Sequence, residues 1–187
     1  IIQRMVQAKR LTSMILYGPP GIGKTSIASA IAGSTRYAFR TLNAATDGKK
    51  ELEQVVEEAK FSGTLILLLD EIHRLNTTKQ DFLLPHLESG RIILIGATTE
   101  NPYIAINPAI RSRVQIFELK PLSPEQVCMG LTRALADQER GLGKYPVQVQ
   151  DGVLEHFAQV SGGDIRTSLD ALELAVLSTE PDKKGQI

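Results

Sequence analysis

The stretch Gly18-Pro19-Pro20-Gly21-Ile22-Gly23-Lys24-Thr25 decides the fold, because it matches G-x-x-x-x-G-K-[ST], the loop that cradles nucleotide phosphates. The apolar residues 14–17 predict a buried strand that enters this loop, and residues 25–32 predict a helix that leaves it. Glycines let successive backbone N–H groups turn towards an anion, and the N-terminus of the helix adds its dipole. The stretch therefore predicts a P-loop.

Two side chains of the loop carry specific chemistry. Lys24 supplies a positive charge for the β- and γ-phosphates, and the Thr25 hydroxyl is a ligand for Mg²⁺. The alternative is a glycine-rich turn with a chance Lys-Thr pair, which the agreement of strand, loop, helix and hydroxyl disfavours. The residues predicted to bind ATP are Gly18, Pro19, Pro20, Gly21, Ile22, Gly23, Lys24, Thr25, Ser26 and Asp70.

An acidic pair, Asp70-Glu71, follows the apolar run at residues 64–69. Such a run is typical of a strand buried on both faces of a parallel sheet. Ligands of open α/β sheets bind at the carboxyl ends of strands, so we expect Asp70 to hold Mg²⁺ together with Thr25. Glu71 is then the candidate general base for an attacking water. The alternative is that the pair only caps the next helix.

Strands and helices alternate along the first two thirds of the chain, which implies a parallel sheet with helices on both faces. Besides the two strands above, strands are predicted at residues 37–43, 91–97 and 114–119. The other helices predicted in this part cover residues 1–10, a stretch opened by Asp47-Gly48 and a stretch capped by Asn76.

From residue 122 onward the pattern is helical. Helices are expected at about 124–140, 151–161 and 163–179, and the polar residues 180–185 are expected to fray. The predicted fold class is α/β, of the P-loop NTPase type. A five-stranded parallel sheet flanked by helices occupies residues 1–121, and a small all-helical lid domain occupies residues 122–187.

Composition excludes several classes of protein. The 187 residues contain no apolar run of about 18, so no membrane-spanning helix is expected. With 21 basic and 21 acidic residues the chain is not a strongly basic nucleic-acid module, although a local patch or a ring can still bind DNA. The single Cys128 excludes an internal disulfide. Because the chain starts Ile1-Ile2, without an initiator Met or signal peptide, we expect it to be part of a longer protein.

Other polar residues have two interpretations each. Thr98-Thr99 ends the fourth strand, where a hydroxyl either orients the γ-phosphate or the water, or caps the loop. Arg111 and Arg113 precede the fifth strand and are either surface residues or a source of charge for a neighbour's nucleotide. Arg166 either folds over the phosphates or caps a helix, and His73 either contacts the site or a neighbouring subunit, or packs.

These pieces in this order resemble the AAA+ ATPases, and more narrowly their clamp-loader and Holliday-junction-motor branch, over essentially the whole chain. The resemblance implies that the P-loop is Walker A and that residues 65–71 are Walker B. It also implies that Thr99 is sensor 1, Arg113 the arginine finger and Arg166 sensor 2 on the lid. In this group a polar residue at Asn43 can hold Glu71 away from water until DNA binds; otherwise Asn43 caps the loop before Asp47.

Three strings narrow the resemblance to the RarA/MgsA family of replication-associated recombination ATPases. They are D-E-I-H-R-L-N at residues 70–76, I-G-A-T-T-E-N-P at residues 95–102 and L-N-A-A-T-D-G at residues 42–48. The family implies Mg²⁺-dependent ATP hydrolysis in DNA replication, recombination and repair, at stalled forks or recombination intermediates. It further implies a cytoplasmic, nucleoid-associated homo-oligomer that binds fork, gap or end structures of DNA, with single-stranded DNA-binding protein as a further candidate partner and no membrane.

Other functions stay open at this point. The nearest rival is a Holliday-junction branch-migration motor or a clamp-loader-type subunit, and the segment 100–102 favours the RarA-like interpretation. The intact Lys24, Thr25, Asp70 and Glu71 argue against a non-hydrolysing switch. A small-molecule kinase lacks an evident acceptor-binding element. Family members also carry an N-terminal segment that helps to enclose the adenine and a C-terminal oligomerisation domain. Both are missing from these 187 residues, so we expect weak nucleotide binding and assembly.

Overall fold

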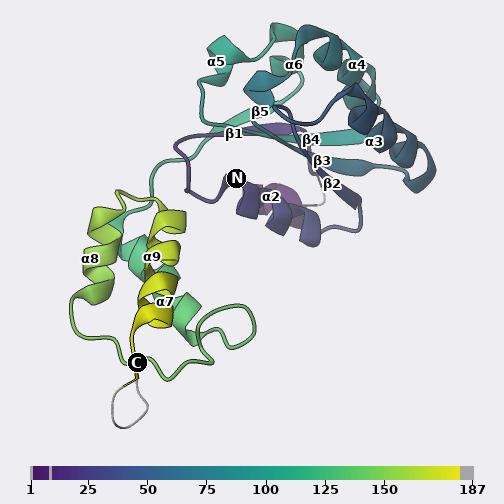
Figure 1. Cartoon of the computed structure of the whole chain (residues 1–187). Coiled ribbons are helices and arrows are strands. Elements are labelled where there is room, and N and C mark those ends of the chain that lie inside the picture. Colours follow the sequence, from purple (N-terminus) through teal and green to yellow (C-terminus); the bar gives the residue numbers. More distant parts are fainter. Residues whose placement is uncertain (1, 9, 182–187) are drawn as a thin grey trace. The chain divides into compact units, whose positions relative to one another are not determined.

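The computed structural model describes residues 2–8 and 10–181, which fall into two compact units (Figure 1). The first unit contains the described residues up to Gly18 together with Lys24–Leu119. The second contains Pro19–Gly23 and the described residues from Lys120 onward. Most of the tail that was expected to fray lies outside the described residues, as do residues 1 and 9 of the first predicted helix.

A five-stranded sheet forms the centre of the first unit, with the strand order β2-β3-β4-β1-β5. Every neighbouring pair is parallel, which confirms the predicted five-stranded parallel sheet. The strands are β1 (Met14–Tyr17), β2 (Ala38–Asn43), β3 (Leu65–Asp70), β4 (Ile92–Thr98) and β5 (Gln115–Glu118).

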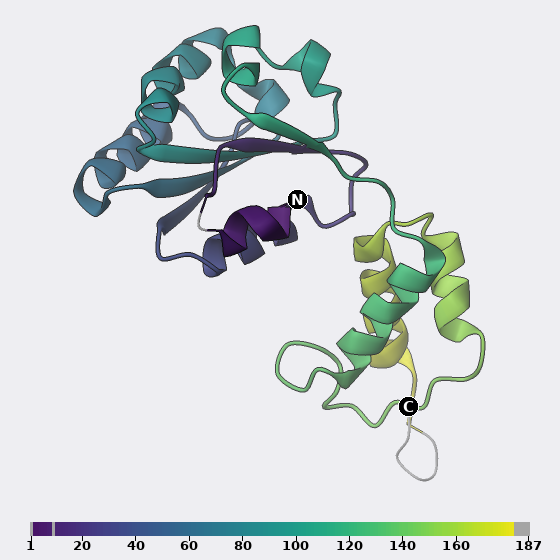
Figure 2. The same ribbon diagram turned by 180° about the vertical axis from the view of Figure 1, so that it is seen from behind.

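Helices cover both faces of this sheet, as Figures 1 and 2 show from opposite sides. One face packs against α1 (Ile2–Gln7) and α2 (Lys24–Gly33), and the other against α3 (Lys49–Ser62), α4 (Thr77–Glu88) and the short α6 (Pro108–Arg111). Because successive residues of a strand point to opposite faces, β3 supplies Leu67 to one core and Ile66 to the other. This double burial explains the continuous apolar run in the sequence.

The second unit is helical and consists of α7 (Pro124–Ala136), α8 (Val153–Val160) and α9 (Ile165–Ser178) together with the segment 19–23. Val127 and Leu131 of α7 pack with Leu172 and Val176 of α9 in its core. Ser123 caps α7 through a reciprocal pair of hydrogen bonds with Gln126. Among the described residues, no helix combines the length and the apolar character needed to cross a membrane.

The structure differs from the prediction in the end of one helix and in two short additional helices. The helix expected to run to residue 140 ends at Ala136, because the Asp137 carboxylate accepts the backbone N–H groups of Glu139 and Arg140 at 2.9 Å each and closes a turn instead. Two four-residue helices, α5 (Pro102–Ala105) and α6, were not predicted. Both start with an Asn cap followed by Pro, a signal that the sequence contains twice.

Candidate nucleotide-binding site

The predicted P-loop has the backbone that anion binding requires. Gly18, Gly21 and Gly23 adopt φ values of 152°, 71° and 89°, a region that residues with a side chain rarely enter. Helix α2 starts at Lys24 directly after these turns, so its free N–H groups and its dipole lie at the end of the loop. The Lys24 ammonium donates to the Gly18 carbonyl at 2.8 Å. Glycine turns that lead into a helix N-terminus with a lysine at its start are the local elements that phosphate binding requires.

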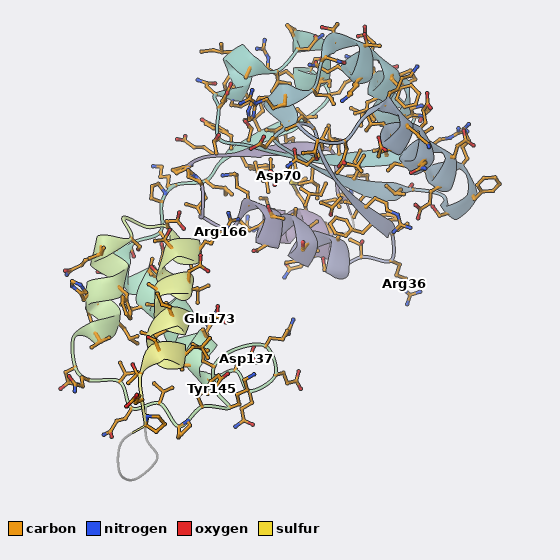
Figure 3. The ribbon with its side chains drawn as sticks, viewed as in Figure 1. Arg36, Asp70, Asp137, Tyr145, Arg166 and Glu173 are labelled. Carbon is orange, nitrogen blue, oxygen red and sulfur yellow. The ribbon has the colours of Figure 1, made fainter. Side chains whose placement is uncertain are left out.

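Three neighbouring strands end together beside the start of the loop. Tyr17 pairs in register with Thr98, and the Gly18 N–H donates to the Thr98 carbonyl at 3.2 Å. Strand β4 also pairs with β3, which ends at the half-buried Asp70, labelled in Figure 3. The parallel sheet therefore brings the beginning of the loop, Asp70 and the Thr98-Thr99 pair to one edge.

Glu71 leaves this edge with an unusual backbone. Its φ and ψ of 50° and 40° lie in the left-handed region, and it is the one described residue other than glycine with a positive φ. The Glu71 N–H donates to the Asp70 carboxylate at 2.9 Å, and a 3₁₀ helix, η1 (Ile72–Arg74), follows at once. The Glu71 side chain is exposed. Its carboxylate is therefore placed at the surface by a bent backbone, at the end of a rigid strand.

The two threonines at the end of β4 have different environments. The buried Thr98 hydroxyl lies 2.9 Å from His73 Nδ1 and accepts the N–H of Glu100 at 3.0 Å. Thr99 is exposed at the same edge. Of the two hydroxyls, that of Thr98 is engaged inside the protein. This difference supports Thr99 as the group that can face a ligand, the position given to it by the sequence.

The two candidate arginines before β5 have different partners. The Arg111 guanidinium donates to the Tyr103 carbonyl and lies 5.9 Å from the centre of the Tyr103 ring, so it fastens α5. Arg113 is more exposed and forms an ion pair with Glu88 at the end of α4. The sequence could not separate these two residues. Both guanidiniums make contacts within the chain, and greater exposure distinguishes Arg113 from Arg111.

Arg166 belongs to the second unit, in the first turn of α9 (Figure 3). Asp164 caps this helix by accepting the Thr167 N–H at 3.0 Å. In the same unit the Ile165 N–H donates to the Gly21 carbonyl at 3.1 Å. A Cβ atom at Gly21 would lie 1.8 Å from Asp164 Oδ1, so this position requires glycine for its space as well as for its φ.

Asn43 at the end of β2 is used by its own loop. Its side-chain oxygen accepts the Ala45 N–H at 2.8 Å, and its backbone N–H donates to the Asp47 carboxylate at 2.7 Å. These contacts support the capping alternative. Asn43 also pairs in register with Asp70, so it lies at the same edge of the sheet as the candidate site.

The sequence is similar to those of known proteins. Residues 14–122 match the family model described as the ATPase family associated with various cellular activities (AAA). Replication-associated recombination protein A of Bacillus subtilis (strain 168) is 67% identical over 187 residues, which are 100% of this chain and 44% of that protein. The protein of the same name from Escherichia coli (strain K12) is 39% identical over 189 residues, 99% of this chain and 42% of its own length. The chain thus spans less than half the length of these curated relatives.

A solved structure shares the fold. The Thermotoga maritima RuvB Holliday junction branch migration motor matches with a TM-score of 0.75 at 23% sequence identity, covering 95% of this chain and 60% of that one. At this identity the likeness establishes only the common fold of sheet and helices, and it says nothing about the chemistry of the site.

Proposed function

Because this chain belongs to the AAA family of ATPases, and within it to the replication-associated recombination protein A (RarA) family, we propose that it hydrolyses ATP with Mg²⁺ for a DNA-associated replication and recombination factor. This membership confirms the resemblance to the RarA family and the ATPase that the sequence predicted. We further propose that this factor acts at stalled forks or recombination intermediates. We also propose that this factor takes part in DNA repair, lies in the cytoplasm in association with the nucleoid, and forms a homo-oligomer.

The observation that carries the proposal is the common edge of β1, β4 and β3. This edge gathers the first glycine of the P-loop, Thr99 and the Asp70-Glu71 pair on strands that are hydrogen-bonded neighbours. A phosphate cradle, a carboxylate and an exposed glutamate within one edge are the elements that phosphoryl transfer to water requires. A plain structural turn has no need for this combination.

Each residue then has a defined task. Lys24 and the loop N–H groups bind the phosphates, and Thr25 and Asp70 would hold Mg²⁺, which when bound neutralises phosphate charge. Glu71 accepts the proton of the attacking water, because a carboxylate is the base available at that edge. Thr99 orients the γ-phosphate or the water by its hydroxyl.

Two arginines complete the proposed site. Arg113 supplies transition-state charge to the nucleotide of a neighbouring copy, and Arg166 acts as the sensor on the lid. The first role requires assembly, so the proposal includes a homo-oligomer. The exposed position of Arg113 supports it.

The decisive experiment is ATPase turnover in the presence of defined DNAs. The full-length protein is given single-stranded, duplex, gapped, forked and four-way-junction DNA of equal nucleotide content, with and without single-stranded DNA-binding protein. Stimulation by forked or gapped DNA supports the proposal. Stimulation confined to the four-way junction would favour a branch-migration motor, and turnover that needs a small-molecule acceptor would favour a kinase.

A further inference from the structure

A buried cluster joins the turn after Glu71 to the end of β4. His73 Nδ1 lies 2.9 Å from Thr98 Oγ1, and His73 Nε2 lies 3.5 Å from Glu100 Oε1. The His73 side chain is 7% exposed and Thr98 is 2% exposed. Removing one partner of a buried hydrogen bond leaves the other unsatisfied, so this contact resists being broken.

The Thr98 hydroxyl has two partners in this cluster. Thr98 Oγ1 accepts the Glu100 N–H at 3.0 Å and at the same time lies within hydrogen-bond distance of His73 Nδ1. Thr98 therefore links His73 to the loop that contains Glu100.

The segment that this cluster fastens contains the strained residue Glu71. A left-handed backbone at a residue with a side chain persists only where the surroundings fix it. The Arg74 N–H donates to the Glu71 carbonyl at 2.8 Å, so η1 and Glu71 form one turn. Ile72 seats the same turn on β4, because a Cβ at Gly96 would lie 2.7 Å from Ile72 Cδ1. Because Gly96 has no side chain, η1 can pack closely against β4. The contact of His73 with Thr98 then holds η1 in that position.

We propose that His73 is a positioning residue for the Glu71 carboxylate. By binding Thr98, it holds the turn that presents Glu71 against the end of β4, directly before Thr99. Thr98 also accepts the Gly18 N–H through its carbonyl, so one residue links the turn of Glu71 to the start of the P-loop. The inference rests on the proposed role of Glu71 as the base.

The test compares variants that remove the hydrogen bond between His73 and Thr98 with variants that keep it. A positioning role requires this hydrogen bond, whereas a packing role does not. His73→Leu removes both ring nitrogens, and His73→Asn keeps a polar atom near the place of Nδ1. Thr98→Val removes the hydroxyl with little change of shape. His156→Leu, on the exposed side of α8, is the matched control for loss of an imidazole. All are made in the full-length protein, and kcat, KM, Mg·ATP affinity and melting temperature are measured for each.

We expect His73→Leu and Thr98→Val each to lower kcat about 10- to 100-fold with KM within about threefold, because a misplaced group loses rate and not ground-state binding. The double variant should lose no more than the worse single one, since both remove the same contact. His73→Asn should recover most of kcat, and His156→Leu should leave it unchanged. In a Glu71→Gln background, adding His73→Leu should change the residual rate less than about twofold.

Folded His73→Leu and Thr98→Val proteins that keep kcat within about twofold of the unchanged protein would overturn the inference. Additive losses in the double variant, or a full His73→Leu loss in the Glu71→Gln background, would overturn it too. If His73→Leu does not fold, the nearly isosteric Thr98→Val decides. If Glu71→Gln itself turns over at the unchanged rate, the proposed base is wrong, which is a different outcome from failure of the His73 variants alone.

Discussion

Arg113 is held by Glu88 across the surface of the first unit. The Nε atom of Arg113 donates to Glu88 Oε1 at 2.8 Å, and a second guanidinium nitrogen pairs with the same oxygen. The two side chains are 36% and 52% exposed, and exposed pairs of this kind contribute about 0–1 kcal/mol. The same guanidinium also donates to the Ala109 carbonyl at 2.7 Å and to the Ser112 hydroxyl at 2.9 Å. If Arg113 acts on a neighbouring nucleotide, it has to exchange these contacts for the phosphate.

The trans role of Arg113 predicts rescue between two inactive proteins. Arg113→Ala lacks the finger and Lys24→Ala lacks phosphate binding, so a mixed interface can still combine an intact finger with an intact P-loop. An arginine finger is worth about 10³–10⁵ in rate where it has been measured in GTPases. ATPase activity is measured over the full mixing range in assemblies shown to exchange subunits. Absence of rescue would exclude the trans role, and a loss that follows Arg111→Ala would identify the other arginine.

Glu88 provides a second test of the same interface. Glu88→Gln removes the carboxylate charge that competes for Arg113 and keeps the shape of the side chain. We expect turnover to stay equal or to rise, by no more than about fivefold, because the surface pair is weak. Steady-state ATPase at several protein concentrations measures this effect. A loss of activity above tenfold, with the fold intact, would mean that Glu88 positions Arg113 for its task and does not compete with the nucleotide.

The acidic pair predicts a separation of binding from turnover. Glu71→Gln should keep Mg·ATP affinity and lower turnover by at least about 10²-fold, which is typical for loss of a positioned base. Lys24→Ala should instead weaken Mg·ATP binding by at least about tenfold, because it removes a charge-assisted contact. Equilibrium binding and single-turnover hydrolysis distinguish the two. Equal turnover of Glu71→Gln and the unchanged protein would contradict the assignment of the base.

If the finger acts in trans, the ATPase of these 187 residues depends on encounters between copies. Specific activity should then be weak and should rise with protein concentration, whereas a self-sufficient site gives a constant value per chain. We expect light scattering to report mainly monomer at micromolar concentration. A stable ring under those conditions, or a specific activity independent of concentration, would be the contrary result.

Asn43 should behave as a cap of its loop. Asn43→Ala removes the acceptor of the Ala45 N–H, and we expect the free energy of unfolding to fall by about 0.5–1.5 kcal/mol. Asn43→Asp keeps a side-chain oxygen there and should recover most of that loss. Chemical unfolding measures both, and the ratio of ATPase with and without DNA should not change. Raised basal turnover with lost stimulation would support a switch that restrains Glu71.

The central sheet and the P-loop could be predicted because their signals are local. Residues 64–69 are apolar without interruption since β3 is buried on both faces, and the glycine spacing records the backbone turns of the loop. Asp70 and the start of the loop lie at the same edge of the sheet, because the carboxyl ends of parallel strands share one edge. These inferences need no knowledge of which distant side chains touch.

The contacts of His73 and Arg113 could not be predicted, because they join residues far apart in the chain. His73 and Thr98 are 25 residues apart, and they meet only because β3 and β4 are neighbours in the sheet. Arg113 and Glu88 are likewise 25 residues apart. The left-handed backbone of Glu71 could not be predicted either, because such a backbone is usually signalled by a glycine in the sequence and this position is a glutamate. Such features depend on strand order and on local strain, and neither leaves a periodic pattern.

The burial of the central strands has a consequence for how the protein opens. All seven residues of β4 and five of the six in β3 are buried. Their amide protons should therefore exchange with solvent only when the whole first unit unfolds, whereas the exposed ends of the chain's loops exchange through small local openings. Asp70 and Thr98 are the last residues of these two strands. The proposed catalytic edge is thus anchored in the part of the first unit that should unfold last.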